Sequence, residues 1–379
     1  MDSGDLDALL VLNMAEGIGP VLLRRCLEAF GSPQAALRAS VRELSAVEGI
    51  GPRRASDLRA GIDKLLGEPL LREKELMQQH GTVAVGQDDA LYPALLRHIH
   101  DPPPILYVRG QLQEEDAVAL AIVGSRRCTH YGREQADRLA SLGSSAGLCI
   151  VSGGAYGVDA AAHRATIRAG GRTIAVLGSG IAKPYPQDHA ELFDQIAAGH
   201  GAVVSELPMT FPVIAENFPR RNRIISGMSL GVLVVEAAAR SGALITARLA
   251  AEEHGREVMA VPGRVDSPAS AGCHKMIREG WATLVTSLAD VLDALGETGQ
   301  MLKAGRMATP PSEEASASLF DHNVSESQRC ILDALGEPRG LDELAAETGL
   351  AIAALQADLT MLQIRGSVVK QGATFRRKR

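Results

Sequence analysis

Aromatic side chains are scarce in this sequence, at 3% of the 379 residues, with 6 Phe, 5 Tyr and 1 Trp. Many proteins that hold single-stranded nucleic acid stack its bases on aromatic side chains, and the sequence excludes an extended platform of that kind. Hydrophobic residues still make up 46% of the chain. Aliphatic residues therefore fill the core, and any nucleic acid would be held mostly through backbone amides and guanidinium groups.

The sequence also lacks the features of secreted, membrane and metal-binding proteins. No apolar run reaches the roughly 18 residues of a membrane span, and the acidic start MDSGDLDALL is unlike a signal peptide. The cysteines are odd in number and lack CxxC spacing, which argues against a zinc site or a disulfide framework. We expect a cytoplasmic protein with reduced thiols, no metal and no cofactor. The cysteines are Cys26, Cys128, Cys149, Cys273 and Cys330.

Excess positive charge is missing as well. The chain has 39 Lys and Arg against 45 Asp and Glu, a formal net charge of −6. A nucleic-acid role therefore requires local basic patches on an acidic protein.

Changes in composition divide the chain into five segments, which is consistent with about two to three domains at this length. We expect a helical repeat at 1–66 and, at 67–117, a connector or extension of the core that contains the short strand ILYVRG. An α/β core follows at 118–298, then a flexible linker at 299–323 and a compact tail at 324–379.

The first segment contains an internal repeat, because EGIGP at 16–20 returns at 48–52. A glycine-bounded turn between two helical stretches predicts a tandem pair of helix-hairpin-helix motifs. The turn amides and the following helix N-terminus can hold a DNA phosphate, although the same module can also serve packing or protein contacts alone. The arginines that follow the turns are Arg24, Arg25, Arg53 and Arg54.

In the α/β core, nearly continuous apolar runs alternate with helical stretches. The runs are ALAIVG, LCIVSG, RTIAVLG, GAVVSE, GVLVVEA and EVMAVPG. This pattern indicates a buried parallel sheet with helices on both faces. Right-handed crossovers bring the strand-to-helix loops to one edge, where doubly wound folds bind ligands.

Small residues follow the expected strands on that edge, in the sequences GSRR, SGGAYG, GSGI and RSGALIT. They let the backbone approach an anion closely, and the helix N-terminus behind each loop offers unsatisfied N–H groups. A tight turn can require glycine for steric reasons alone, but four such loops on one edge, two of them with arginine, predict a phosphate-lined groove. From these loops we expect contacts from Gly124, Ser125, Arg126, Arg127, Ser152, Gly153, Gly154, Ser241 and Gly242.

The sequence NFPRRNRIISG places three arginines and an asparagine at the start of an apolar helix. The arginine fork suits phosphate oxygens, and cations near a helix N-terminus oppose its dipole unless an anion is bound. We therefore expect Arg221, Asn222 and Arg223 to face the ligand. The alternative is an internal ion pair between one arginine and Glu206 or Glu236.

Three single residues are each open to two interpretations. Lys183 can reach a phosphate or simply be solvated. Asp159 and His163 lie one helical turn apart and can form an acid/base pair, but such a pair more often orients a loop or bonds the backbone.

The tail contains ESQRCILDAL, LDELAAETGL and AIAALQADLTMLQIRG, followed by a short terminal hairpin. This order predicts a winged helix. The acidic first helices argue against strong DNA binding, whereas the terminal Arg376, Arg377, Lys378 and Arg379 argue for some, unless they form a solvated basic tail.

Several motifs together resemble the DNA-processing protein A (DprA/Smf) family. They are IVGSR, SGGAYGVDAAAH, VLGSGI with a following YP, FPRRNRIISGMS, and SGALITA with VPG. The resemblance covers most of the α/β core, and it extends to the N-terminal repeat and the winged-helix-like tail.

The resemblance implies a Rossmann-like homodimer without catalytic activity, which binds single-stranded DNA and hands it to the RecA recombinase during natural transformation and recombination. It also implies that the Gly124–Arg126 loop, the Ser152–Gly154 loop and the segment from Arg221 to Arg223 line the DNA groove.

Three other functions compete with this interpretation. The core also resembles nucleotide phosphoribohydrolases, but Leu249 stands where their catalytic glutamate is expected, and leucine cannot act as an acid or base. A dinucleotide-dependent oxidoreductase requires GxGxxG after the first strand, where this chain has GSRRCT. A regulator that binds duplex DNA through the tail would keep its affinity in the isolated tail.

Overall fold

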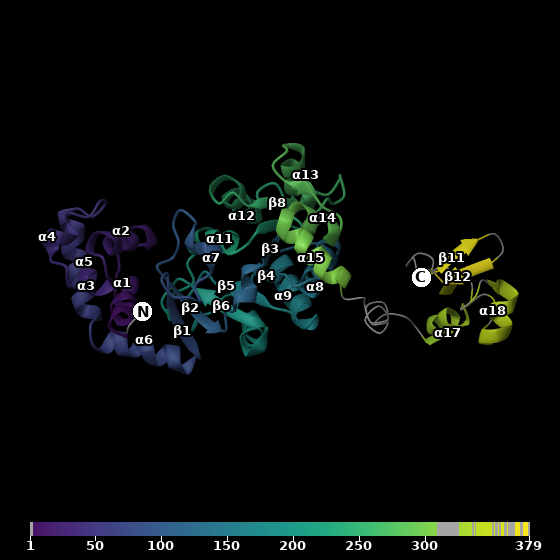
Figure 1. Ribbon diagram of the computed structural model, residues 1–379, viewed down its shortest axis with the longest axis horizontal. Helices are drawn as coiled ribbons and strands as arrows, with labels where there is room; N and C mark the ends of the chain where they lie inside the picture. Colours follow the sequence, from purple (N-terminus) through teal and green to yellow (C-terminus); the bar gives the residue numbers. More distant parts are fainter. Residues whose placement is uncertain are drawn as a thin grey trace. The chain divides into compact units, whose positions relative to one another are not determined.

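A computed structural model of the protein describes most of the chain and divides it into two compact units, Met1–Arg306 and Met307–Arg379. Each unit is presented by itself (Figure 1). The described residues are 3–308, 326–335, 337, 339–350, 352, 355, 358–359, 362, 368–371 and 374–377.

The first unit begins with a small helical bundle, here called the hairpin module (Figure 1). The two repeat turns end at Gly19 and Gly51, which are extended N-cap residues followed by proline at the first helical position. This confirms the tandem helix-hairpin-helix prediction. The helices of the module are α1 (Ser3–Met14), α2 (Pro20–Phe30), α3 (Pro33–Arg38), α4 (Val41–Leu44) and α5 (Pro52–Leu65).

The centre of the first unit is a nine-stranded sheet in the order β1-β2-β6-β5-β4-β3-β7-β8-β9. From β6 across to β9 all neighbouring strands are parallel. The strands are β1 (Thr82–Gly86), β2 (Ile105–Gly110), β3 (Ala119–Val123), β4 (Cys149–Ser152), β5 (Thr173–Val176), β6 (Gly201–Ser205), β7 (Gly231–Val234), β8 (Glu257–Ala260) and β9 (Thr283–Leu284).

Helices cover both faces of the sheet because the strands are apolar on both sides. Along β3, Leu120 and Ile122 pack in one cluster with α8, α9 and α14. Ala121 and Val123 belong to the other cluster, which includes side chains of α11, α12 and α13. The helices are α8 (His130–Ser145), α9 (Val158–Arg168), α10 (Ala190–Gln195), α11 (Asn217–Gly227), α12 (Ala243–Arg248), α13 (Ala271–Arg278) and α14 (Leu288–Ala294).

The structure differs from the expected parallel sheet at one edge. β1 pairs antiparallel with β2, and β2 pairs antiparallel with β6. Both strands come from the predicted connector, which also holds α6 (Glu68–Gln79) and α7 (Ala94–Arg97). Only the short α7 lies between β1 and β2, because an antiparallel pair needs no crossover helix.

The predicted flexible linker also begins differently. α15 (Gly296–Ala308) continues through its first ten residues. The Leu302 side chain packs against the cluster under α8 and α14, which explains why this stretch is helical despite its glycines. Residues 309–323 lie outside the described part of the chain.

The second unit has the helices and three-stranded sheet of a winged helix. The sheet order is β10-β12-β11, and Ile331, Leu344 and Phe375 share one small core. Lys378 and Arg379 of the predicted basic tail lie outside the described residues. The elements are α17 (Glu326–Ala334), β10 (Arg339–Gly340), α18 (Leu341–Thr348), β11 (Val368–Gln371) and β12 (Thr374–Arg377).

Among the described helices of both units, none combines the length and the apolar character that crossing a membrane requires.

Candidate nucleic-acid interface

The candidate site lies where the strand order of the sheet reverses. The chain moves from β3 to β4 in one direction along the sheet and later adds β7 on the opposite side of β3. The loops that leave β3 and β7 therefore diverge, which opens a crevice at the carboxyl ends of the strands. A cleft of about 860 Å³ occupies this position, and we call it the central cleft.

The loop after β3 forms one wall of the central cleft. The Ser125 amide donates to the Glu236 carbonyl over 2.7 Å, which ties this loop to the one after β7. The Glu236 carboxylate in turn accepts from the Thr129 amide and hydroxyl at the start of α8. These bonds leave Arg126 and Arg127 exposed at the cleft.

The loop after β7 supplies the facing wall. Arg240, Ser241 and Gly242 all line the central cleft, and contacts were expected from the last two. Arg240 is exposed, like Arg126 and Arg127. Within the described part of the chain, no carboxylate lies within ion-pair distance of these three arginines, so they concentrate positive charge on an acidic protein.

The loop after β4 lines the central cleft only at Ala155, and its glycines lie beneath the cleft. Ser152 is buried and its hydroxyl donates to the Ile122 carbonyl over 2.6 Å. The amides of Gly153 and Ala155 donate to the Asp159 carboxylate over 3.1 and 3.3 Å. The Gly153 amide predicted to hold phosphate is therefore already bonded inside the protein.

Gly154 differs from the prediction in the same way. Its carbonyl contacts the His189 ring nitrogen at 2.9 Å, and neither Ser152 nor Gly154 lines the central cleft. Gly153 lines only a small adjoining cavity of about 20 Å³. The spacing of the glycines indicates a loop, but it does not show which of the loop amides are bonded inside the protein.

Gly157 joins the β3 and β4 loops. It has a φ of +78°, and a Cβ atom there would lie 2.2 Å from the Ser125 carbonyl oxygen. Only glycine combines this backbone conformation with so close an approach. The next residue, Val158, donates its amide to the same Ser125 carbonyl over 3.3 Å.

Arg221 reaches the cleft from beneath. It is 5% exposed, and its Nη1 donates to the carbonyls of Gly153, over 2.8 Å, and Val176. Its buried Nε has no partner. Burial lowers the pKa of Arg221 to about 10, against the opposing effect of Asp159. Asn222 also lines the cleft, so both residues are where the sequence placed them.

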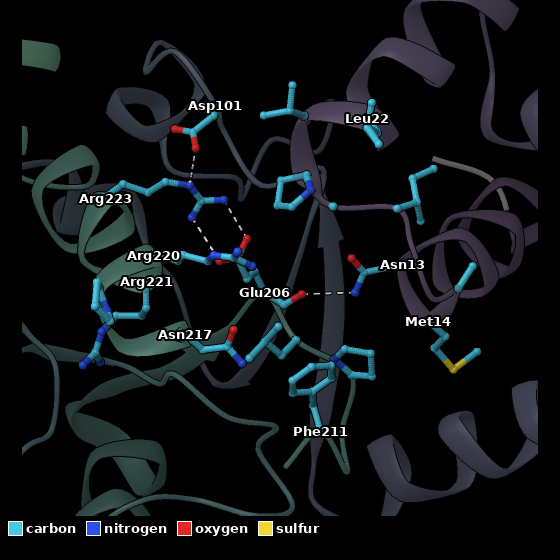
Figure 2. Close-up of a pocket in the computed structure, with 18 of the residues that line it drawn as sticks. Asn13, Met14, Leu22, Asp101, Glu206, Phe211, Asn217, Arg220, Arg221 and Arg223 are labelled. Carbon is cyan, nitrogen blue, oxygen red and sulfur yellow. Dashed lines mark hydrogen bonds and ion pairs between the residues drawn. The ribbon is translucent and has the colours of Figure 1, made fainter. Parts of the chain in front are cut away.

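Arg223 does not face the central cleft. It points into a second cavity of about 820 Å³, between the core and the first turn of the hairpin module (Figure 2). There its guanidinium pairs with Glu206 over 2.7 and 3.0 Å and with Asp101 over 2.8 Å. The sequence predicted that Arg223 faces the ligand, with an internal ion pair as the alternative. The structure shows the alternative, an ion pair with Glu206. Two residues along a helix turn a side chain by about 200°, so Arg221 and Arg223 cannot share a face.

Lys183 is exposed in the loop after β5 and lies outside the central cleft. Its backbone carbonyl accepts from the Ser179 hydroxyl over 2.8 Å. The Lys183 side chain is exposed, but it does not line the cleft with Arg126, Arg127 and Arg240.

Two of the few aromatic side chains lie at the cleft, which sequence reasoning missed. Phe218 and Tyr185 are 5.4 Å apart at their ring centroids, and the Arg126 guanidinium lies 5.4 Å from the Phe218 ring. The half-exposed side chains of Val213 and Ile245 extend this apolar rim. Phe218 stands two residues before Arg220, the first residue of the arginine cluster, and that proximity in the sequence was the available signal.

The arginines of the hairpin module are mostly held by the module itself or by the core. Arg24 donates to the His100 carbonyl over 2.6 Å, Arg25 to the Glu48 carbonyl over 3.0 Å and Arg54 to the Gly49 carbonyl over 2.9 Å. The first repeat turn lines the second cavity. This module therefore presents less free positive charge than its sequence indicates.

Asp159 and His163 do not form an acid/base pair that reaches the cleft. Asp159 holds the β4 loop, and buried His163 places its Nδ1 2.7 Å from the Thr173 hydroxyl. Burial lowers the pKa of His163 to about 3. The loop-orienting interpretation of Asp159 agrees with these contacts. Among the described residues no group of His, Cys, Asp and Glu is arranged to hold a metal ion.

Comparison with known proteins now decides the family. The model of the family described as DNA recombination-mediator protein A matches residues 83–296. The chain belongs to this family. A SAM-like helix-hairpin-helix tandem matches residues 9–64, and a DprA winged helix domain matches residues 308–373.

Family relatives match across nearly the whole chain. Protein Smf of a Synechocystis species is 34% identical over 97% of this chain and 98% of its own length. The X-ray structure of DNA processing protein A from Streptococcus pneumoniae aligns with a TM-score of 0.67 at 33% identity, covering 77% of this chain and 98% of that one. A Helicobacter pylori DNA processing protein A, whose structure addresses its single-stranded DNA binding mode, aligns with a TM-score of 0.51 at 27% identity, covering 56% and 95%.

The Gly157 contact gives a first prediction for this family member. Gly157→Ala should lower the free energy of unfolding by about 3 kcal/mol or more, because the positive φ is strained and the new Cβ overlaps Ser125. Gly170→Ala is the matched control, since Gly170 has a φ of +70° with open space around it. It should lose only about 1 kcal/mol. Equal losses for both variants in urea denaturation would contradict the close packing of the two loops.

A second prediction concerns the buried histidine. The folded state keeps His163 neutral, whereas the unfolded chain takes up a proton below its ordinary pKa of 6.5. Acid therefore destabilises the wild type through this residue. From pH 6.5 to 5.5 the wild type should lose about 1 kcal/mol more stability than His163→Gln. A constant difference between the two proteins in urea denaturation at both pH values would show that His163 is not buried neutral.

Proposed function

We propose that this protein binds single-stranded DNA in the central cleft, through its phosphate backbone, and delivers it to a RecA-type recombinase. As the family resemblance implies, it acts as a homodimer through the α/β core, without catalysis, and supports natural transformation and recombination. Because DNA and recombinase meet in the cytoplasm, the proposal places the protein there.

The observation that carries the proposal is the gathering of Arg126, Arg127 and Arg240 at one cleft. All three are exposed and lack an acidic partner among the described residues. Buried Arg221 adds a fourth positive charge, and Asp159 is the one carboxylate among the residues that line the cleft. Since the whole chain carries −6, this local excess supports an anionic ligand.

The apolar rim supports a single strand as that ligand. Phe218, Tyr185 and Ile245 offer surface to exposed bases beside the arginines, and stacking on such side chains tolerates any sequence. A duplex would present only its phosphates here. The H. pylori relative, for which single-stranded DNA binding is described, shares the fold over 56% of this chain.

The phosphoribohydrolase alternative finds no support in the geometry of the cleft. Leu249 occupies the position of the expected glutamate, and Asp159 is held by two backbone amides. A general acid or base has to reach the reacting atoms, and among the residues that the structure describes no other carboxylate lines the cleft. A non-catalytic binding protein therefore fits the described residues better.

The direct test of the proposal is fluorescence anisotropy of a labelled oligothymidylate across a salt series. Arg126→Ala should weaken binding by about tenfold, equivalent to about 1.4 kcal/mol. It should also lower the slope of log affinity against log salt by about 0.7, because one phosphate contact is lost. Arg164→Ala is the matched control, since Arg164 is exposed on α9 and lies outside the cleft.

Competition with duplex DNA separates this proposal from its rival. Wild type should prefer the single strand. If duplex competes equally and Arg126→Ala binds as wild type does, the DNA site belongs to the hairpin module or the winged helix.

A further inference from the structure

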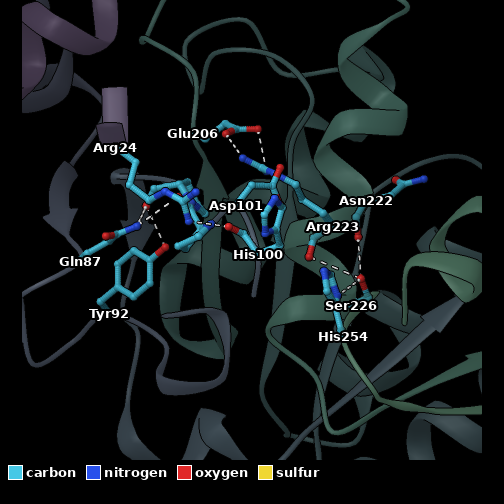
Figure 3. Close-up of polar contacts among 12 residues, drawn as sticks. Arg24, Gln87, Tyr92, His100, Asp101, Glu206, Asn222, Arg223, Ser226 and His254 are labelled. Carbon is cyan, nitrogen blue, oxygen red and sulfur yellow. Dashed lines mark hydrogen bonds and ion pairs between the residues drawn. The ribbon is translucent and has the colours of Figure 1, made fainter. Parts of the chain in front are cut away.

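Arg223 is the centre of a buried polar cluster that joins separate segments of the first unit (Figure 3). Its Nη1 and Nη2 contact both carboxylate oxygens of Glu206, and its Nε contacts Asp101. The side chains of Arg223 and Glu206 are 7% and 12% exposed. The Nε, Nη1 and Nη2 atoms of Arg223 therefore each have a carboxylate acceptor inside the protein.

The two acids connect Arg223 to the hairpin module. The backbone carbonyl of Glu206 accepts from the side-chain Nδ2 of Asn13, in α1, over 3.1 Å. The carbonyl of His100, which precedes Asp101, accepts from Arg24 of α2 over 2.6 Å. Arg223 thus holds the two core segments on which the hairpin module rests.

The same helix forms part of the central cleft. Arg221 and Asn222 of α11 line the central cleft, and Arg221 also borders the second cavity, whereas Arg223 lines the second cavity and not the cleft. The segment that leads from Glu206 into α11 also borders both spaces. Leu207 and Phe211 line the second cavity, and Val213 lines the central cleft. A shift of α11 on the Glu206 side would therefore move the wall of the cleft.

We propose that Arg223 is a positioning residue for DNA binding. Its ion pairs with Asp101 and Glu206 fix α11 against the hairpin module, so that the module sets the geometry, and with it the affinity, of the central cleft. This inference rests on the proposed binding of single-stranded DNA. Of the two arginines in RNRIISG, Arg223 is the one that does not line the cleft. The inference gives it a role in DNA binding without contact to DNA.

The charge-conserving variant Arg223→Lys tests this assignment in the full-length protein. Lysine keeps the positive charge but lacks the planar fork that holds both Glu206 oxygens and Asp101. We expect affinity for oligothymidylate to fall by about tenfold while the salt slope stays within about 0.3 of wild type, since no phosphate contact is lost.

Arg172→Lys controls for lost stability. Arg172 makes an equally fork-shaped pair with buried Asp116, over 2.6 and 2.7 Å, and also donates to the Gln111 carbonyl. It precedes β5, at the opposite end of the strands from the cleft. Its replacement should lower the melting temperature as Arg223→Lys does, and leave DNA affinity unchanged.

Asn13→Ala tests the part assigned to the hairpin module. It removes one hydrogen bond to Glu206 far from the cleft, and we expect a severalfold loss of affinity with an unchanged salt slope. Unchanged affinity in this variant would overturn the role of the module.

Two further results would overturn the proposal itself. In one, Arg223→Lys binds as wild type does while Arg126→Ala is impaired, which leaves the DNA site intact and Arg223 without a role in it. In the other, Arg223→Gln lowers the salt slope by as much as Arg126→Ala, which would make Arg223 a phosphate contact. If wild type itself does not bind oligothymidylate, the proposed function fails and the inference fails with it.

Discussion

The reversal of strand order beside β3 is the constraint on which the rest of the site depends. A parallel sheet that grows outward on both sides of one strand sends two neighbouring loops in opposite directions. In this chain the loops after β3 and β7 carry the exposed arginines, and the bond from Ser125 to Glu236 keeps the two loops in register. The cleft is therefore a consequence of topology, and the side chains decide what it binds.

Charge is distributed so that an acidic protein still offers an anion site. Most arginines in the first unit are used internally, as Arg172 is with Asp116 and Arg223 with Glu206. Arg126, Arg127 and Arg240 stay free of carboxylates in the described residues, and the nearby Glu236 carboxylate accepts from Thr129 instead. Arginines of the hairpin module are also used internally, since Arg24, Arg25 and Arg54 donate to backbone carbonyls. Free charge, rather than total charge, marks the cleft.

The sequence predicted the central strands and the loops behind them, because buried parallel strands are continuous apolar runs and small residues follow each one. It also placed Arg126, Asn222 and Ser241 correctly at the cleft. It could not show that Asp159 uses the Gly153 amide, since that bond depends on how the β4 loop folds back on α9. Helix periodicity alone separates Arg221 from Arg223, but which one faces the cleft depends on the sheet beneath α11. The sequence predicted β2 as the short strand ILYVRG, but it showed neither β1 nor the antiparallel pairing of β2 with β1 and β6.

We propose that a single strand of DNA lies in the central cleft while Arg223 stays paired with Glu206 inside the protein. The most direct measurement is a crystal structure of the full-length protein with a short oligothymidylate. We predict a backbone phosphate against the Arg126 guanidinium, a base beside Phe218, and Arg223 still bonded to Glu206. An empty cleft with DNA on the hairpin module or the winged helix, or Arg223 released from Glu206 to contact a phosphate, would contradict the account.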